Sequence, residues 1–509
     1  MNSAPAVRYA PGWGARIRRP GPAMRRWRRE PAPAILLAAM AGALAGALAV
    51  EAPVPARTAA GLAVMGSYFL VAIRTRKLAL ALVVVWLIFM GLVRRALIPF
   101  LGWPGLDPLL LLGPVCAVIL WITSRQRGAR TLLATLILLQ LALVAAQVFN
   151  PLVEDVVSGI LATLFWVGPL LWFFVGRTLT PSQLERVFGV VTIALVPVVA
   201  HGLIQSFGVF FPLEFTWVGV SGFGEAIFMQ NFRIRPFSTL TSPQEYGFFL
   251  SFGAAVLWSR ILTERRRRVP RLLLLAPTVV ALFLQASRGI FLFFALMLIV
   301  TMLLWTRASA TRLIGLSSVA FLVVVATFHT ARPGQSPPTR LDPGTSSLET
   351  LARHQIAGFS NPQSSTLPVH AELIAEAFRA ALERPFGSGL SEGTIARTKI
   401  GDERMPGPEN DIATVFLALG IPAGLLFLGF IAAAFREALR RLRTHPGALS
   451  LGTVGILIAF LTQWWTGAMY TASALLWLVL GGLAGAGHPR ASHPGRYEPL
   501  KSEEGRRGT

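Results

Sequence analysis

Arg288 is a charged residue inside an otherwise apolar stretch of the chain. Mostly apolar residues run through 272–285 on one side of it and 290–305 on the other, and the string at the junction is Ala-Ser-Arg-Gly. Placing an arginine at bilayer depth costs roughly 2.5–3.5 kcal/mol on insertion scales. Such a residue indicates a functional site by default, and its guanidinium group is suited to binding an anion. The alternative is a tight hairpin between two helices, with the arginine reaching out to lipid phosphate.

The composition indicates a protein that crosses a membrane many times. Apolar residues make up 54% of the chain and charged residues 14%, whereas a soluble domain has about 25% charged residues. The net charge of +23 does not indicate nucleic-acid binding, because the arginines lie in short segments between apolar runs, as topology determinants do. The chain has no zinc-type ligand spacing, and its single cysteine, Cys116, excludes disulfides within the chain.

We expect an all-α polytopic integral membrane protein with about fourteen transmembrane helices, because apolar stretches long enough to cross a core of about 30 Å recur along the chain. When the basic N-terminus is placed inside, arginine-rich loops and both termini fall in the cytoplasm. The first span follows a basic stretch and could be a signal peptide, but further spans follow at once, which favours an uncleaved helix. The predicted spans are 33–50, 59–73, 77–93, 106–123, 131–149, 156–176, 187–210, 245–262, 271–286, 289–305, 313–330, 410–435, 449–467 and 470–487.

The predicted organisation places one large loop outside the membrane. That loop should contain short helices, one of them following Pro368 and ending before Pro385. The regions in chain order are a basic cytoplasmic tail (1–32), eleven helices (33–330), the periplasmic loop (331–407), three helices (408–487) and a second cytoplasmic tail (488–509).

Two groups of residues need a separate account in this topology. Arg94 and Arg95 fall on the outer side, so either the third helix is misplaced or the pair binds lipid headgroups. Trp464, Trp465 and Tyr470 lie near a helix end, where an interfacial aromatic belt is expected.

Three arginines fall on the predicted outer face: Arg233, Arg235 and Arg288. Guanidinium groups bind phosphate oxygens in a bidentate manner and keep their charge. A lipid-linked diphosphate lies at this depth, and as the leaving group of a glycosyl transfer it would develop charge that these donors could stabilise. A further group must then accept a proton from the acceptor hydroxyl.

The residues around these arginines resemble the O-antigen ligase and polymerase family. The segment from Arg235 through Ser238 to Pro243-Gln244 resembles an arginine–glycine–proline–asparagine pattern of that family, with serine for glycine and glutamine for asparagine. Ser287-Arg288-Gly289 resembles its serine–arginine–glycine signature. The third likeness consists of three parts in chain order. They are the Pro-Phe-Gly-Ser-Gly string at 385–389, Asn410, and the Ala-Leu-Gly-Ile-Pro-Ala-Gly string at 418–424. The resemblance covers about residues 187–487.

The chain departs from this family at Glu409, where members usually have a histidine before the asparagine. The resemblance implies that this position assists deprotonation of the acceptor, which a glutamate can do if burial raises its pKa. Glu409 could instead be an ordinary acid at a helix start. His370 is predicted to bind substrate, and His354 and His370 are alternative bases, although a structural role fits either.

The resemblance implies a glycosyltransferase of the bacterial inner membrane that moves a glycan from undecaprenyl diphosphate to a hydroxyl. The acceptor would be another lipid-linked glycan in a polymerase, or lipid A core in a ligase; the change at Glu409 favours a polymerase. We expect no metal and no cofactor, and possible partners are other polysaccharide-assembly proteins. The alternative from another class is a transporter or flippase for a lipid-linked anion. The nearly apolar helix interiors speak against it, because a transport path needs polar groups at the midplane.

Overall fold

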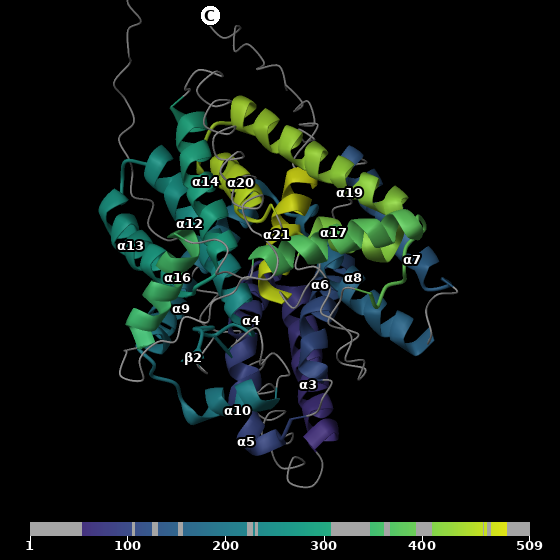
Figure 1. Ribbon diagram of the computed structural model, residues 1–509, viewed down its shortest axis with the longest axis horizontal. Helices are drawn as coiled ribbons and strands as arrows, with labels where there is room; N and C mark the ends of the chain where they lie inside the picture. The colour runs from purple at the N-terminus through teal and green to yellow at the C-terminus, as the bar shows by residue number, and fades with distance from the viewer. Residues whose placement is uncertain are drawn as a thin grey trace, which may run out of the picture.

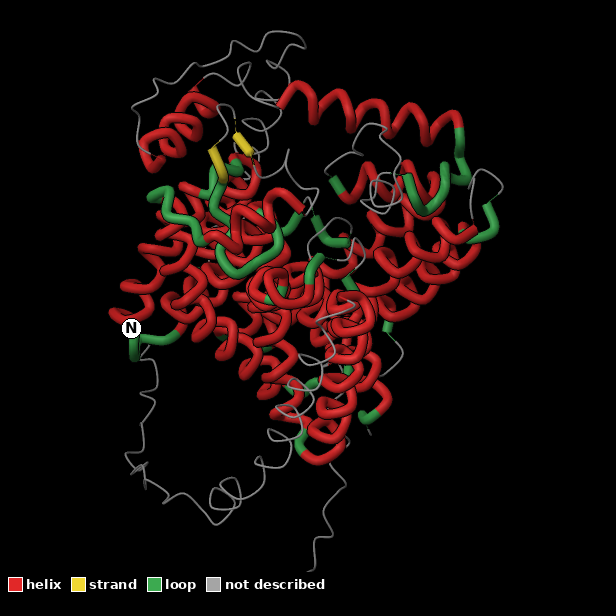
Figure 2. Tube along the Cα trace, turned by 90° about the horizontal axis from the view of Figure 1, so that it is seen from below, coloured by secondary structure: helices red, strands yellow, loops and turns green. Residues whose placement is uncertain are grey.

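The computed structural model describes a helical protein (Figures 1 and 2). The residues that it describes are 53–103, 107–124, 131–150, 156–220, 228–229, 233–306, 347–360, 367–392, 410–461, 463–465 and 470–485. Figure 2 shows helices over almost all of this part, with two short strands. These strands, β1 (Phe228–Met229) and β2 (Arg233–Ile234), pair antiparallel.

Five described helices are long and apolar enough to cross a membrane: α4 (Arg76–Ala96), α9 (Pro181–Ser206), α12 (Pro243–Thr263), α14 (Arg288–Trp305) and α19 (Asp411–Thr444). Five shorter apolar helical stretches accompany them: Pro108–Ile122, which comprises η1 (Pro108–Leu111) and α6 (Leu112–Ile122), α7 (Leu132–Gln147), Ala162–Gly176 within α8 (Val156–Gly176), α20 (Ala448–Ala459) and α21 (Tyr470–Gly485). The remaining helices are α3 (Pro53–Arg74), α5 (Ile98–Leu101), α10 (Pro212–Val220), α13 (Arg268–Leu284), α16 (Ser347–Ser360) and α17 (Leu367–Glu383).

The prediction of an all-helical polytopic membrane protein is confirmed. Each expected span overlaps a helix or a pair of helices, except the spans at 33–50 and 313–330, which lie outside the described residues; the number of spans stays a prediction. Within the predicted outer loop, α17 matches the helix expected between the two prolines. Figure 1 shows α16 and α17 lying across the front of the bundle, where α16 packs on α9, α13 and α14 and α17 packs on α19.

The span expected at 449–467 is shorter than predicted. Helix α20 ends at Ala459, and the chain then turns so that Trp464 and Trp465 enter the core, where both are almost fully buried. The backbone N–H of Trp465 donates to Asp411, and its indole N–H donates to the carbonyl of Trp166, 2.6 Å away. The prediction that these tryptophans form an interfacial belt is therefore wrong.

Of the two explanations considered for Arg94 and Arg95, binding to lipid headgroups is wrong, because both side chains are buried inside the protein. Arg94 Nε lies 2.7 Å from Asp107 Oδ2, which also pairs with Arg57 at 2.8 Å. Arg95 donates to two backbone carbonyl oxygens, those of Ser238 and Leu240. Each guanidinium group also lies against aromatic rings, as the negative face of a ring favours.

Helices α8 and α21 pack closely against each other through glycine residues. A Cβ atom at Gly481 would overlap the carbonyl oxygen of Phe173, and one at Gly176 would overlap that of Leu478. Helices in membranes associate through small residues of this kind, because these let the backbones approach closely. Helix α21 is buried over nearly its whole length as a result.

We predict that Gly481→Ala destabilises the detergent-solubilised protein by several kcal/mol, because the new methyl group meets backbone that cannot yield as a side chain does. Gly429→Ala is the matched control, since a Cβ atom there meets nothing within 4 Å. In a helix this control should gain up to about 1 kcal/mol. Thermal unfolding of both variants tests the difference; equal midpoints would contradict the packing.

Candidate active site

The Ser-Arg-Gly signature forms the junction between α13 and α14. Helix α13 ends at Leu284, Ala286 takes a positive φ of 67°, and α14 begins at Arg288. Gln285 is fully buried and holds the junction closed: its amide oxygen accepts from the N–H of Ser287 at 3.0 Å, and its amide nitrogen donates to the carbonyl of Pro243 at 2.7 Å. The hairpin expected as the alternative account of Arg288 is therefore present; at its tip Ala286 is buried, Ser287 and Arg288 are half-buried and Gly289 is exposed.

Arg235 reaches this junction from the segment before α12. Its Nε donates to the carbonyl of Gln285 at 3.2 Å, and one terminal nitrogen donates to the hydroxyl of Ser287. Two of the three likenesses found in the sequence thus contact one another directly. Arg235 thus contacts the residue directly before Arg288, although the two arginines lie far apart along the chain, and the charges of both act on His354.

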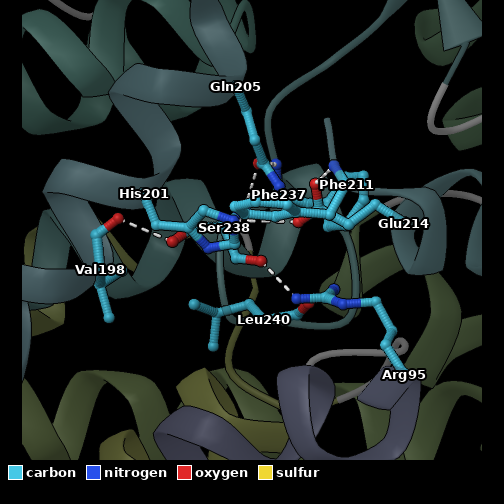
Figure 3. A network of polar contacts seen from close by, with 9 residues as sticks. All are labelled: Arg95, Val198, His201, Gln205, Phe211, Glu214, Phe237, Ser238 and Leu240. Carbon is cyan, nitrogen blue, oxygen red and sulfur yellow. Dashed lines mark hydrogen bonds and ion pairs between the residues drawn. The ribbon is translucent and has the colours of Figure 1, made fainter. Parts of the chain in front are cut away.

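A buried polar network fixes the segment that carries Arg235 (Figure 3). The side-chain oxygen of Gln205 accepts from the backbone N–H groups of Phe237 at 2.9 Å and Ser238 at 2.6 Å. Arg95 holds the other side of the same turn through the carbonyls of Ser238 and Leu240. A buried backbone N–H or carbonyl group that is hydrogen-bonded avoids the free-energy cost of being left unsatisfied. These hydrogen bonds therefore hold the turn in one conformation although it has no regular secondary structure.

Ser238 stands where the family pattern has glycine, and its φ is 51°. This left-handed region favours glycine, which explains the pattern in physical terms. Here a serine occupies it, with its hydroxyl donating to the carbonyl of Val198 at 2.7 Å.

Glu214 completes the network from α10. It accepts from Gln205 at 2.6 Å and from the backbone of Phe211 at 2.8 Å, and it lies 3.0 Å from Nε2 of His201. Burial alone would raise the pKa of Glu214, but the hydrogen bonds of His201 and of the Phe211 backbone, together with the charges of His201 and Arg95, bring that pKa below its usual range. This carboxylate stabilises the turn as a fixed anion.

Glu245 anchors the start of α12 from inside the core. Its carboxylate accepts from the N–H and hydroxyl of Thr241 and from the N–H of Thr471 at 2.6 Å. The residue is fully buried with these donors around it, so it joins α12 to α21 and is not available to a substrate.

Helix α16 covers the arginine pair. Leu351 is buried against Leu284 and Ala286, and Nε2 of His354 lies 3.0 Å from a terminal nitrogen of Arg288. Burial and the charges of Arg288 and Arg235 lower the pKa of His354 to about 4. His354 is therefore neutral at pH 7, and its Nε2 accepts the hydrogen bond from Arg288.

The third likeness is a backbone junction between the loop and α19. The N–H groups of Ser388 and Gly389 donate to the carbonyls of Leu417 and Ala418, and the N–H of Ile421 donates to the carbonyl of Pro385. The helical conformation of α19 is interrupted at Gly420, where φ is 84°. The segment 385–389 is hydrogen-bonded to the backbone beside this interruption. The two glycine-rich strings therefore position the end of the loop; the contacts show no chemistry there.

The other predicted site residues are less well placed by the structure. Arg233 lies in β2, two residues before Arg235. His370 lies half-buried near the start of α17. Glu409 lies outside the described residues. The next residue, Asn410, caps α19 by accepting from the N–H groups of Ile412 and Ala413.

Sequence reasoning did not find the two glutamines that organise the site. Gln205 and Gln285 each stand near the end of an apolar helix, and both are fully buried. A polar residue in such a place must find partners, and that requirement is the signal that could have identified them.

We predict that docking of α16 weakens as the pH falls from about 6.5 toward 4. The pKa of His354 lies below the value of about 6.5 usual for the unfolded chain. Between the two values the undocked state binds more protons, so acid favours it; above pH 6.5 the contact is fully present. Hydrogen exchange of α16, corrected for intrinsic rates, should show this loss of protection, and His354→Gln should remove the pH dependence. Unchanged protection down to pH 4.5 would contradict it.

Comparison with known proteins gives one family match. A family model described as O-antigen ligase matches residues 272–428, from α13 through the first half of α19. No curated protein matches the chain. The matched segment contains the Ser-Arg-Gly junction, helices α16 and α17 and the broken start of α19, and over these residues the chain is similar to the O-antigen ligase family.

Proposed function

We propose that the protein transfers a glycan from undecaprenyl diphosphate to an acceptor hydroxyl at the outer face of the bacterial inner membrane. The family assignment implies a membrane glycosyltransferase of the O-antigen ligase type. The observation that carries the proposal is that Arg235 binds Ser287, next to Arg288, and that the charges of both arginines act on His354. The proposed topology has fourteen spans, cytoplasmic termini and the segment 331–407 outside.

Arg288 is the better candidate of the two for a direct phosphate contact. Among the described residues its hydrogen-bond partner is the neutral His354, and no carboxylate pairs with it. A guanidinium group without a compensating anion at bilayer depth is costly. A diphosphate would supply that anion, with Arg288, Arg235 and Arg233 as donors and His370 contributing to substrate binding.

The proposed reaction is a direct displacement without a metal. The acceptor oxygen attacks the anomeric carbon, the bond from that carbon to the diphosphate oxygen breaks, and the diphosphate leaves with the electron pair. The arginines stabilise the charge that develops on the leaving group. Glu409 takes the proton from the acceptor hydroxyl. His370 and His354 are the alternative bases, and His354 is the weaker of them because its Nε2 accepts a hydrogen bond from Arg288.

The acceptor decides between polymerase and ligase. We propose a polymerase, in which a second lipid-linked glycan supplies the hydroxyl, because the histidine stressed in ligases is replaced by Glu409 here. The alternative, a transporter or flippase for a lipid-linked anion, predicts movement of the lipid without formation of a longer glycan.

We predict that Arg288→Lys loses roughly tenfold to a hundredfold of its glycan transfer, because lysine keeps the charge but not the planar fork. Arg271→Lys is the matched control, since Arg271 lies at the opposite end of the same helical hairpin and pairs with Glu264. Transfer is measured with purified protein in liposomes at equal protein levels. Near-normal transfer by Arg288→Lys would mean that the residue supplies only a point charge.

We predict that Glu409→Gln lowers transfer by at least about a hundredfold, the usual scale for loss of a general base. If Glu409 only favours the start of α19, the cost is about 1 kcal/mol of stability or less, with transfer intact. Transfer rate and thermal stability measured on the same preparation separate these outcomes. Normal transfer would remove Glu409 from the mechanism.

A further inference from the structure

Helix α17 has three sides of different character. Ala377 and Ala381 are buried, and the helix packs on α19. Residues that follow one another at spacings of four and three lie on one side of a helix. A second side is suited to water, because it carries exposed charged residues at such spacings: Glu372, Glu376, Arg379 and Glu383.

The third side of α17 is apolar and exposed. Phe378 and Leu382, one helical turn apart, are 37% and 73% exposed, and Phe386, just beyond the helix, is 77% exposed. We call these three residues the apolar row. The ring of Phe378 contacts that of Phe416 on α19, with 5.2 Å between the centroids, so the row begins against the bundle. Contiguous exposed apolar side chains of this size mark a surface that binds a partner or a membrane.

The nearby helix α7 has an exposed side that faces lipid. Along this side the exposed residues follow one another at spacings of four, three and four, and the last of them lies just after the helix: Leu138, Ala142, Ala145 and Phe149. Helix α7 contains no charged residue. An exposed side of such a helix in a membrane protein is covered by hydrocarbon.

The two apolar surfaces meet at the C-terminal end of α7. The side-chain amide of Gln147 donates to the carbonyl of Phe386. The amide of Asn150 donates to the carbonyl of Gly387 at 3.2 Å. Phe149 lies between these two donors in the chain and is 86% exposed, so the lipid-facing side of α7 ends beside the apolar row. Because α17 lies across the front of the bundle instead of along it (Figure 1), the apolar row extends this surface sideways at the end of an apolar helix.

We propose that α17 is an interfacial helix, with the apolar row among the lipids of the outer leaflet and the charged side in water. Interfacial helices place their apolar face at the boundary between headgroups and acyl chains, while the polar face stays hydrated. Lipid is the occupant that fits, because the apolar row continues a surface that lipid already covers. The charged side has three glutamates and one arginine, so lipid phosphates would repel it and favour the orientation with the apolar row toward the acyl chains.

The choice of leaflet rests on the proposed topology, in which the segment 331–407 lies outside. The contact with lipid does not depend on glycan transfer. It would hold the segment 385–389, which is hydrogen-bonded to α19, at the depth of the headgroups. The diphosphate of a lipid-linked glycan lies at the same depth.

The test places a fluorescent label on each of two neighbouring exposed positions of the full-length protein. Leu382→Cys carries the label in the apolar row, and Glu383→Cys carries it on the charged side as the matched control. Both variants also carry Cys116→Ala, since Cys116 is the single cysteine of the chain and is buried. The labelled proteins are placed singly in nanodiscs. Two quenchers are then compared: lipids with a nitroxide close to the headgroup, and iodide in the water.

An interfacial α17 predicts that the lipid nitroxide quenches the label at position 382 several-fold more strongly than the label at position 383, and that iodide shows the reverse order. Equal quenching by iodide at both positions would overturn the proposal, because the apolar row would then face water. Protection of position 382 from both quenchers would also overturn it, since protein would then cover the row.

Two further outcomes separate the occupants and the hypotheses. Loss of lipid quenching at position 382 when two copies share a nanodisc would overturn the proposal in favour of a second copy of the chain as the occupant. A protein that shows the predicted quenching but transfers no glycan would support the interfacial helix and refute the proposed function.

Discussion

A guanidinium group inside an apolar bundle must find oxygens or aromatic rings, and this constraint organises the structure. Arg57 and Arg94 share Asp107, and Arg95 is held by two carbonyl oxygens and lies against the ring of Phe237. These three cations are neutralised or solvated by the protein itself. Arg95 holds the C-terminal end of α4 against the turn before α12, so these cations support the candidate site without entering it.

Arg288 differs from these cations in its partner. Within the described part of the chain it contacts a histidine that is neutral at pH 7, and that histidine lies on a helix of the loop. Arg235 is tied to the same junction through Ser287 and the carbonyl of Gln285. The residue that the protein places near Arg288 is therefore a second cation, Arg235, and not an anion. A bound diphosphate would stabilise two such neighbouring cations.

The sequence predicts the helices well, because apolar runs of sufficient length form helices in a membrane whatever their partners are. It also predicts that Arg235 and Arg288 belong together. It cannot tell a structural arginine from a binding one, since Arg95 and Arg288 both interrupt or end an apolar run. Only the tertiary contacts show that Arg95 is hydrogen-bonded to backbone carbonyl oxygens inside the protein.

The other differences between the sequence predictions and the structure also arise from tertiary contacts. Trp464 and Trp465 enter the core because α20 stops early and the chain turns inward, which no local periodicity encodes. Gln205 and Gln285 look like scattered polar residues in the sequence, yet each closes a turn through several hydrogen bonds. Glu409 and the side chain of Arg233 lie outside what the structure describes, so their roles stay predictions.

The central claim is that Arg235 and Arg288 act as one diphosphate site. A double-mutant cycle with Arg235→Gln and Arg288→Gln, read out as the affinity for sugar-free undecaprenyl diphosphate, tests it most directly. The account predicts that the double variant binds far more tightly than the sum of the single losses would give, with a coupling energy of about 1 kcal/mol or more. Additive losses, or single variants that bind the lipid normally, would contradict a shared site.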